Sequence, residues 1–440
     1  MNFVSTRGAS AVTFDDALLN GIAADGGLFF PEVLPQFHTD DFADADSMLD
    51  IAKILLTPFF AGSQLADELD SILRETFNFP ILMTPLLIGT RKATLLELFH
   101  GPTAAFKDVG ARFLAACICR LEQRMEMPLT ILVATSGDTG GAVAAAFDEQ
   151  PGIRVVVLFP DGRISERQAH QLTCWSDNVL SLAVRGSFDD CQTLVKSIMA
   201  EASLCEQYRF SSANSINIGR LLPQCTYYAA TSLEHWRETG RPPGFIIPTG
   251  NLGNALACLL VREMGLPVGE VVLATNANRI ITDYLAGSKW LPRDSISTLA
   301  SAMDVGNPSN MERLIHLFGN PAVLNEKIRV CTVSDENIEQ QIRKNYSAFG
   351  FAICPHTATA SYAYEQLSTA IRESQDWIIV ATAHPAKFEL IVEPLIGDEI
   401  PLPVSLQRIQ SKSSRSVSIN ADMGSFEKAL NGQFYLNDGV

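Results

Sequence analysis

Residues 129–147 read LTILVATSGDTGGAVAAAF, and this stretch decides the fold because it contains three elements in a fixed order. Leu129–Ala134 is a short, continuously apolar run, typical of a strand that is covered on both faces. A turn of glycines and hydroxyl residues follows at Thr135–Gly141, and Ala142–Phe147 has the composition of a helix. Strand, turn and helix in this order predict one unit of a parallel α/β sheet.

The same alternation continues along the chain from about Thr94. Further apolar runs predict strands at Ile153–Phe159, Val179–Val184, Phe245–Ile247, Val271–Ala274 and Trp377–Ala381. Helical segments separate most of them, so we expect mostly parallel sheets with crossover helices.

The domain organisation follows from where this pattern begins and ends. Residues 1–92 contain acidic helical stretches and predict a separate N-terminal region. Residues 93–400 predict an α/β region, with a loop-rich insertion near 287–320 that is rich in Ser, Asn and Pro. Residues 401–440 become polar and predict a peripheral C-terminal tail.

Composition and charge exclude several classes of protein. Hydrophobic residues make up 47% of the 440 residues and charged residues 19%, which is a globular composition. The formal charge of −16 argues against nucleic-acid binding and against an anionic membrane surface. No apolar run approaches the ~18 residues that span a bilayer. The N-terminus also lacks a secretory pattern, so a cytoplasmic location is expected.

The nine cysteines predict neither a disulfide framework nor a metal centre. They are odd in number, scattered along the chain and without a C-x-x-C pair. We therefore expect free thiols and no bound metal.

The turn within residues 129–147 has two interpretations. Free N–H groups at the start of the following helix, with the hydroxyls of Ser136 and Thr139, would form an anion-binding site. The alternative is an ordinary turn in which a Ser or Asp side chain caps the helix. The turn matches neither a dinucleotide fingerprint nor a P-loop.

A second turn of this kind follows another apolar strand. Residues 248–255 read PTGNLGNA and lead into a helical segment. Two glycines and two asparagines at a helix N-terminus are suited to cradle a phosphate monoester. A turn chosen for positive φ is the alternative, but the rarity of G-N-x-G-N favours the phosphate cradle.

Lys107 is the candidate nucleophile. It ends the run ELFHGPTAAFK and precedes a helical segment, so it lies among small and apolar residues. An amine in such surroundings loses its proton more easily and can form a Schiff base with an aldehyde cofactor. Taken alone, a lysine whose ammonium group reaches solvent is the favoured interpretation.

Two more segments carry polar groups at expected strand or helix ends. Thr382, after the run Trp377–Ala381, offers a neutral hydroxyl to a ring nitrogen, although a helix cap before Pro385 is favoured in isolation. Residues 211–220 read SSANSINIGR and combine amides, hydroxyls and an arginine that can grip a carboxylate or phosphate. A capped helix with a surface arginine is the alternative.

These segments together resemble the threonine synthases, pyridoxal-phosphate enzymes of fold type II (the tryptophan synthase β family), in their long bacterial and fungal branch. The matching segments occur in the family's order between about residues 20 and 395 and are DGGLFFPEVLP, ELFHGPTAAFKD, ATSGDTGGAVAAAF, SANSINIGR, PTGNLGN, ATNAN, SAMDVGNPSN and TAHPAKF. The resemblance implies two mostly parallel α/β domains and a helical N-terminal region.

The resemblance also implies roles for individual residues. Lys107 would carry pyridoxal 5′-phosphate as a Schiff base, and Thr382 would hydrogen-bond the pyridine nitrogen. The phosphate of the cofactor would lie on Gly250, Asn251, Leu252, Gly253 and Asn254. Substrate carboxylate and phosphate groups would be held by Ser136, Asp138, Thr139, Asn214, Ser215, Asn217 and Arg220.

Two residues depart from the family pattern. Leu252 stands where phenylalanine is common, a tolerable change because the phosphate cradle acts through its backbone. Asp138 stands where many relatives carry asparagine, although threonine synthases also show aspartate. A carboxylate donates a hydrogen bond only when protonated. We expect Asp138 to be either neutral or turned towards the helix N-terminus.

The implied activity is that of a lyase that converts O-phospho-L-homoserine and water to L-threonine and phosphate. Phosphate would leave by γ-elimination, and water would add at the β-carbon. The alternative within the fold is a Ser/Thr dehydratase or an O-phosphohomoserine phospho-lyase. A regulatory protein with a degenerate site is disfavoured because Lys107 and the GNLGN segment are intact. A monomer or small homo-oligomer is expected.

Overall fold

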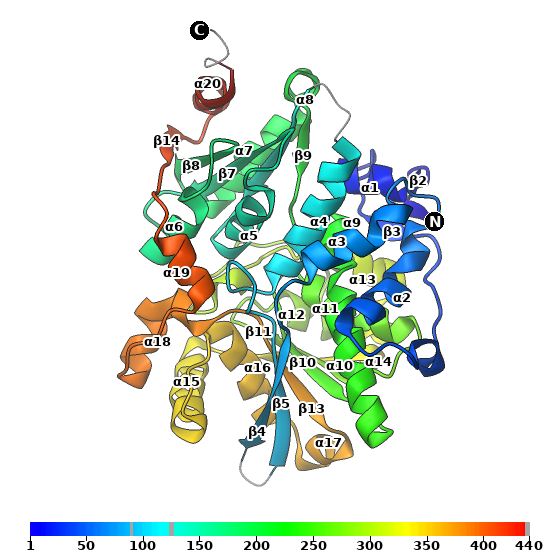
Figure 1. Ribbon diagram of the computed structural model, residues 1–440. Helices are drawn as coiled ribbons and strands as arrows, with labels where there is room; N and C mark the ends of the chain where they lie inside the picture. Colours follow the sequence, from blue (N-terminus) through cyan, green and yellow to red (C-terminus); the bar gives the residue numbers. More distant parts are fainter. Residues whose placement is uncertain (89–90, 123–126, 436–440) are drawn as a thin grey trace.

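The computed structural model describes residues 1–88, 91–122 and 127–435, and Figure 1 shows their two main sheets one above the other. The upper sheet has the strand order β14-β8-β7-β6-β9 and the lower sheet the order β12-β11-β10-β13-β5-β4. All strand pairs in these sheets are parallel except the β4–β5 hairpin. The prediction of an α/β fold with two mostly parallel sheets is confirmed.

The upper lobe is built from two separate stretches of the chain, residues 129–212 and residues 404–434. Its strands are β6 (Leu129–Ala134), β7 (Ile153–Pro160), β8 (Val179–Arg185), β9 (Phe210–Ser212) and β14 (Val417–Asn420). Its helices are α5 (Asp138–Phe147), α6 (Glu166–Thr173), α7 (Phe188–Ala200), α8 (Ala202–Tyr208), α19 (Val404–Gln410) and α20 (Met423–Phe434).

The lower lobe contains the second predicted turn, which follows its strand β10. Its strands are β4 (Leu82–Ile88), β5 (Arg91–Glu97), β10 (Gly244–Pro248), β11 (Val271–Thr275), β12 (Ile328–Thr332) and β13 (Trp377–Ala381). Its helices are α10 (Gln224–Thr239), α11 (Gly253–Glu263), α12 (Ile280–Leu285), α13 (Met311–Phe318), α14 (Pro321–Lys327), α15 (Asp335–Phe349), α16 (Pro355–Gln366), α17 (Thr369–Ser374) and α18 (Glu389–Ile396).

All six strands predicted from apolar runs are present, and β6 and β13 have the predicted ends. Their residues are buried along almost the whole length of each strand, which explains why their sequences are apolar without alternation. Strands β4, β5, β9, β12 and β14 were not predicted; β4 ends in an exposed antiparallel hairpin, and β9 is only three residues long.

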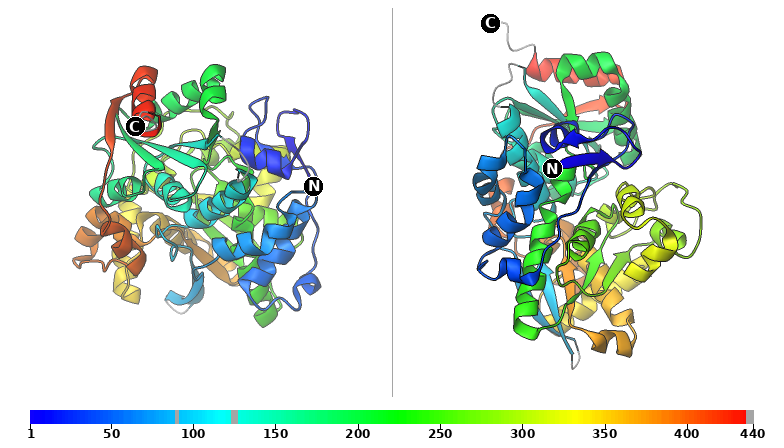
Figure 2. Two further views of the ribbon diagram at one scale, coloured as in Figure 1. Left: turned by 45° about the horizontal axis from the view of Figure 1, so that its top comes forward. Right: turned by 90° about the vertical axis from the view of Figure 1, so that its right-hand side faces the viewer.

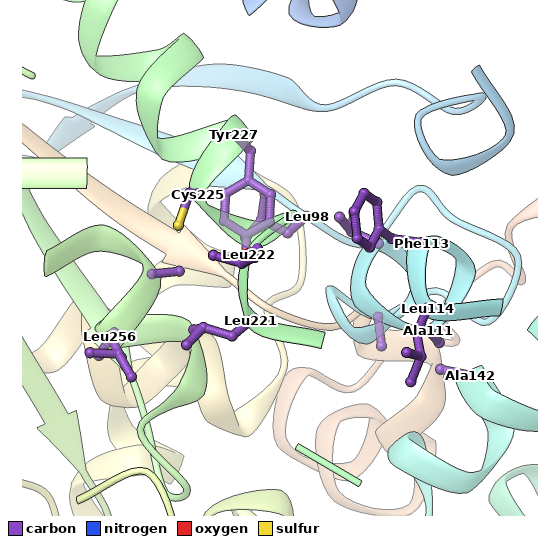
Figure 3. Close-up of a cluster of buried hydrophobic side chains, with 14 of the residues drawn as sticks. Leu98, Ala111, Phe113, Leu114, Ala142, Leu221, Leu222, Cys225, Tyr227 and Leu256 are labelled. Carbon is purple, nitrogen blue, oxygen red and sulfur yellow. The ribbon is translucent and has the colours of Figure 1, made fainter. Parts of the chain in front are cut away.

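A continuous apolar core joins the lobes. Helix α4 (Lys107–Glu122) contributes Phe113 and Leu114, which pack in the same core as Leu221 of short helix α9 (Ile218–Leu221) and Tyr227 of α10, as Figure 3 shows. Phe113, Leu114 and Tyr227 are completely buried. Because α4 begins at Lys107, this packing fixes the position of the candidate nucleophile.

The N-terminal region ends earlier than predicted. It consists of β1 (Asn2–Ser5), β2 (Val12–Thr13), α1 (Phe14–Asn20), β3 (Phe29–Pro31), α2 (Met48–Phe60) and α3 (Leu69–Thr76). Residues 82–97, in contrast, form the β4–β5 edge of the lower sheet. The boundary therefore lies near Phe77 instead of residue 92, because the hairpin pairs with β13 and not with the N-terminal helices. Figure 2 shows the N-terminal strands in dark blue beside the green segments of the body.

The C-terminal segment is part of the upper lobe and not a peripheral tail. Strand β14 pairs with β8 from Val417 to Asn420, and α20 packs against it. Phe426 and Leu430 are completely buried in the core of this lobe. The polar run 411–418 that suggested a tail is the connection that leads to this strand; residues 436–440 lie outside the described residues.

We expect Phe426→Ala to destabilise the protein by about 3–5 kcal/mol, because it removes a completely buried aromatic ring. Urea unfolding followed by circular dichroism measures the change. Lys428→Ala on the exposed side of the same helix is the control and should change stability by less than about 0.5 kcal/mol. Equal effects of the two substitutions would contradict an integral C-terminal segment.

The predicted insertion near 287–320 is only partly a loop. Residues 287–310 are irregular apart from a 3-10 turn at Ser301–Met303, but Met311–Phe318 is helix α13. The helix was missed because the Ser/Asn/Pro composition ends at Asn310. Among the described residues, none of the helices is long and apolar enough to cross a membrane.

Candidate active site

A cleft of about 440 Å³ lies where the two lobes meet. The turns after β6, β10 and β13 line it, so it lies at the carboxyl ends of parallel strands, where α/β proteins usually bind ligands. Twelve of the predicted site residues besides Lys107 also line it: Ser136, Asp138, Thr139, Asn214, Ser215, Arg220, Gly250, Asn251, Leu252, Gly253, Asn254 and Thr382. A larger surface hollow, about 750 Å³ over α4 and α5, contains none of them.

Lys107 and Thr382 are held side by side by backbone hydrogen bonds. The Phe106 N–H donates to the Thr382 carbonyl at 2.8 Å, and the His384 N–H donates to the Ala104 carbonyl at 3.0 Å. These bonds pair the segment before α4 with the segment after β13 in antiparallel fashion. The candidate Schiff-base lysine and the candidate ring-nitrogen partner therefore reach the cleft from one rigid unit.

Hydrogen bonds to Asp108 stabilise the turn before Lys107. Its carboxylate accepts from the Thr103 N–H at 2.9 Å and from the Thr103 hydroxyl at 2.6 Å. Asp108 is buried, and a Cβ on Gly101 would lie only 2.4 Å from its Oδ2. The Gly-Pro-Thr turn thus closes over the start of α4, and glycine is required at its first position.

The segment Gly250–Asn254 turns sharply from β10 into α11. Leu252, at the N-cap of α11, has φ of 66°, a left-handed conformation that residues other than glycine rarely adopt. A Cβ on Gly250 would lie 2.7 Å from the Cα of Met303, so the loop 301–306 packs directly on the turn. The N-terminal N–H groups of an α-helix have no partner within the helix and can bind an anion.

Asn254 carries an unused hydrogen-bond donor in this turn. Its Oδ1 accepts from the hydroxyl of Tyr228, whereas its Nδ2 is buried and has no partner among the described residues. A buried donor without a partner costs about 1–3 kcal/mol. This cost supports a ligand oxygen as the missing partner, as the prediction of a phosphate cradle requires.

Asn310 and Arg313 stabilise the segment Gly250–Asn254 through hydrogen bonds. Asn310 donates from its Nδ2 to the carbonyls of Asn251 at 3.1 Å and Ser215 at 3.3 Å. The completely buried Arg313 donates to Asn310 Oδ1 at 2.7 Å and to the Phe29 carbonyl at 3.0 Å. The cradle, the predicted substrate segment and the N-terminal region are therefore coupled through one network.

Burial governs the protonation of Lys107. Its Nζ lies 3.8 Å from Asp138 Oδ2, and 15% of its side chain is exposed. Burial lowers the pKa of Lys107, and the positive charges of Lys387 and Arg220 lower it further, against the attraction of Asp138. A lysine with a lowered pKa is suited to act as a nucleophile and base.

Asp138 is held in its ionised form. It is the first residue of α5, and its Oδ1 lies 2.8 Å from Lys387 Nζ. Burial alone would raise the pKa of Asp138, but Lys387 and Lys107 hold it well below the ordinary value. Of the two expected states, the geometry disfavours the neutral one.

Arg220 lines the cleft and carries an unused donor. It lies on α9, its Nη1 donates to the Ala213 carbonyl at 2.5 Å, and its buried Nε has no partner in the described part of the chain. Burial lowers the pKa of Arg220 to about 10, so the guanidinium remains charged at neutral pH. It is not the surface arginine of the alternative interpretation.

Asn217 differs from the prediction, because it does not line the cleft. It is completely buried, its Nδ2 donates to the Leu18 carbonyl at 2.8 Å, and its Oδ1 accepts from the Gly219 N–H at 2.9 Å. Asn217 caps α9 and ties it to the N-terminal region, so we assign it no contact with substrate.

Comparison with known proteins places these features in a family. The model of the pyridoxal-phosphate dependent enzymes matches residues 83–383, and models of the threonine synthase N terminus and C-terminal region match residues 2–77 and 357–429. The threonine synthase of Serratia marcescens is 37% identical over 96% of both chains. The threonine synthase of Escherichia coli K12 is 36% identical over 95% of this chain and 96% of its own. The chain belongs to the threonine synthase family.

Solved structures agree with this assignment. The pyridoxal-phosphate-bound threonine synthase of Brucella melitensis has a TM-score of 0.91 at 31% identity, covering 99% of this chain and 100% of its own. The yeast threonine synthase has a TM-score of 0.89 at 28% identity, covering 98% of both chains. The family match at residues 357–429 also includes β14 and most of α20, in agreement with an integral C-terminal segment.

The cleft residues fit the cofactor of this threonine synthase family. The buried donor of Asn254 and the start of α11 are suited to a phosphate group, and the buried amine of Lys107 is suited to an aldehyde. Thr382 offers a neutral hydroxyl at the end of β13.

Two residues at the site were missed by the sequence analysis: His356, which lines the cleft, and Lys387, which contacts the cleft residue Asp138. Lys387 lies in the quoted segment TAHPAKF, and a lysine three residues after His384 in a buried, strand-end motif was an available signal. His356 lies at the start of α16; its Nε2 accepts from the Ala302 N–H at 3.1 Å, and burial lowers its pKa to about 4. Its buried Nδ1 has no partner among the described residues, and no motif in the sequence indicated it.

Proposed function

We propose that this chain converts O-phospho-L-homoserine and water to L-threonine and phosphate, with pyridoxal 5′-phosphate bound in the cleft. One observation carries this proposal: the buried amine of Lys107 and the unpartnered donor of Asn254 line the same cleft. Membership of the threonine synthase family over nearly the full length of the chain supports the choice of reaction. When bound, pyridoxal phosphate withdraws electrons from the α-carbon of an amino-acid substrate and so acidifies its hydrogens.

The residues of the chain supply binding and proton transfer. The cradle Gly250–Asn254 holds the cofactor phosphate, and the Thr382 hydroxyl contacts the pyridine nitrogen without adding charge. Lys107, with its lowered pKa, accepts the proton from the substrate α-carbon and moves protons at the β- and γ-carbons. The burial of Thr382, Asp138 and Asn254 keeps bulk water from the reacting atoms.

The substrate anion groups are proposed to bind opposite the cradle. Arg220 supplies a charged donor, Ser136 and Thr139 supply hydroxyls at the start of α5, and the segment Asn214–Ser215 supplies an amide and a hydroxyl. Positive charge here compensates locally for the formal charge of −16 of the whole chain.

We expect Arg220→Lys to lower kcat/KM for O-phospho-L-homoserine about 10- to 150-fold, the value of one charged hydrogen bond of about 1.5–3 kcal/mol. Lysine keeps the charge but lacks the planar fork of arginine. Steady-state phosphate release measures the effect, and Arg279→Lys, at the exposed N-cap of α12, is the matched control. An unchanged kcat/KM would remove Arg220 from the substrate site.

Incubation with O-phospho-L-homoserine distinguishes the proposal from its alternative. Threonine and phosphate should appear in equal amounts. A phospho-lyase would release phosphate with 2-oxobutanoate instead, and a dehydratase would act on serine or threonine. Quantifying both carbon products by mass spectrometry in one reaction decides between them.

We further propose a cytoplasmic enzyme that acts as a monomer or small homo-oligomer on a small-molecule substrate. The cysteines in the described residues are all free thiols, which supports a reducing compartment. Light scattering of the purified chain measures the oligomeric state.

A further inference from the structure

Lys387 is a lysine buried without any exposed side-chain surface, directly behind the cleft. It lies in the 3-10 turn η4 (Pro385–Phe388), just after β13 and Thr382. Its Nζ donates to the Thr103 carbonyl at 2.7 Å and lies 2.8 Å from Asp138 Oδ1. Lysines are almost never buried in this way unless they are paired, so the pairing with Asp138 is what allows an ammonium group here.

Asp138 is shared between two lysines at unequal distances. Lys387 contacts its Oδ1 at 2.8 Å, whereas Lys107 lies 3.8 Å from its Oδ2. Lys387 has a second oxygen partner in the turn before α4, whereas the other contact of Lys107 is with the ring of Phe106, at 4.8 Å from its centroid. The carboxylate therefore binds Lys387 more closely than Lys107.

Several buried ionisable groups surround Lys107. Those that face it are Asp138 from α5, Lys387 from η4, Arg220 from α9 and Cys354, the N-cap of α16; His356 faces Asp138 from the same helix. A second buried carboxylate, that of Asp108 on α4, interacts with Lys387 and Arg220, so Asp138 is shared between Lys107 and Lys387. Like charges at short range favour loss of a proton from the least tightly held cation, and that cation is Lys107.

We propose that Lys387 is a positioning residue, which holds Asp138 in place as a carboxylate and thereby makes Lys107 the lysine that gives up its proton. This inference rests on the proposed role of Lys107 as the cofactor lysine. In this arrangement Lys387 contacts neither the substrate nor the cofactor. It acts through Asp138 and through its own positive charge.

The test measures the proton affinity of Lys107 in the full chain after removal of the cofactor. Acetic anhydride modifies only unprotonated amines. Peptide mass spectrometry measures the extent of labelling at Lys107 at each pH, and the pH of half-maximal labelling is the titration midpoint of Lys107. Lys53 on α2, whose side chain is 57% exposed, is the internal reference. Since no cofactor or substrate is present, failure of this inference and failure of the proposed reaction are distinguishable.

We expect Lys387→Met to raise the titration midpoint of Lys107 by at least about one pH unit. At a pH below the midpoints of both the parent and the variant, this shift lowers the labelling of Lys107 about tenfold. The substitution removes a cation and leaves the carboxylate of Asp138 to Lys107 alone, and both changes favour the protonated form. The double variant Asp138→Asn/Lys387→Met removes both charges and should return the midpoint towards that of the parent. The proposal would be overturned if the midpoint of Lys107 were unchanged in Lys387→Met. It would also be overturned if the double variant raised that midpoint as much as Lys387→Met does.

A further variant covers the case in which Lys387→Met does not fold. Asp138→Asn keeps the shape of the side chain and removes the anion, so the midpoint of Lys107 should fall by at least about one unit. Circular dichroism confirms that each variant is folded before labelling. A midpoint that rises or stays constant in Asp138→Asn would also overturn the proposal.

Discussion

Lys107→Ala is expected to lower the formation of threonine and phosphate by at least about 10³-fold, because it removes both the amine for the cofactor and the proton-transfer group. The two roles can be separated experimentally. Borohydride reduction followed by peptide mapping should attach the cofactor to Lys107 in the parent and to no residue in the variant. Product analysis by mass spectrometry then measures the loss of turnover.

Controls decide whether such a loss is specific to Lys107. Lys107→Arg keeps the positive charge and should be as inactive as the alanine variant. Lys53→Ala makes the same change on exposed helix α2 and should leave turnover unchanged. Cofactor attachment to Lys387 in the parent enzyme, or near-parental turnover of Lys107→Ala, would contradict the assignment.

The sequence predicts the sheets well because their strands are covered on both faces. Leu129–Ala134 and Trp377–Ala381 are buried along their whole length, so their apolar runs coincide with the strands. The chain ends were predicted less well. The strand Val417–Asn420 is mostly exposed, so its sequence VSIN is not a continuous apolar run, and its pairing with β8 makes it part of the lobe.

Site residues were predictable where backbone geometry demands a rare residue type. Glycine at 250 and the strand–turn–helix motifs follow from local rules, and the structure brings these segments into one cleft. Asn217 shows the limit of such rules, because an amide in a polar motif caps a helix as readily as it binds a ligand. His356 becomes recognisable only when distant segments are folded together, because no motif in the sequence indicates it.

Gly250→Ala is expected to weaken cofactor binding about 5- to 150-fold, the equivalent of about 1–3 kcal/mol of overpacking. The added Cβ would lie 2.7 Å from the Cα of Met303 and 3.1 Å from its carbonyl oxygen. Both are backbone atoms, so no side-chain rotation relieves the contact. Relief requires movement of the cradle itself, which displaces the donors of Asn254 and of the helix start.

Titration of the cofactor-free chain with pyridoxal 5′-phosphate, followed by absorbance, measures this effect. Gly432→Ala on α20 is the matched control, because a Cβ there meets no atom within 4 Å. A strained cradle should also show a selective loss: the affinity for pyridoxal, which lacks the phosphate, should fall less than that for pyridoxal 5′-phosphate. Equal losses for both aldehydes would place the phosphate away from Gly250, whereas a selective loss identifies Gly250–Asn254 as its binding site.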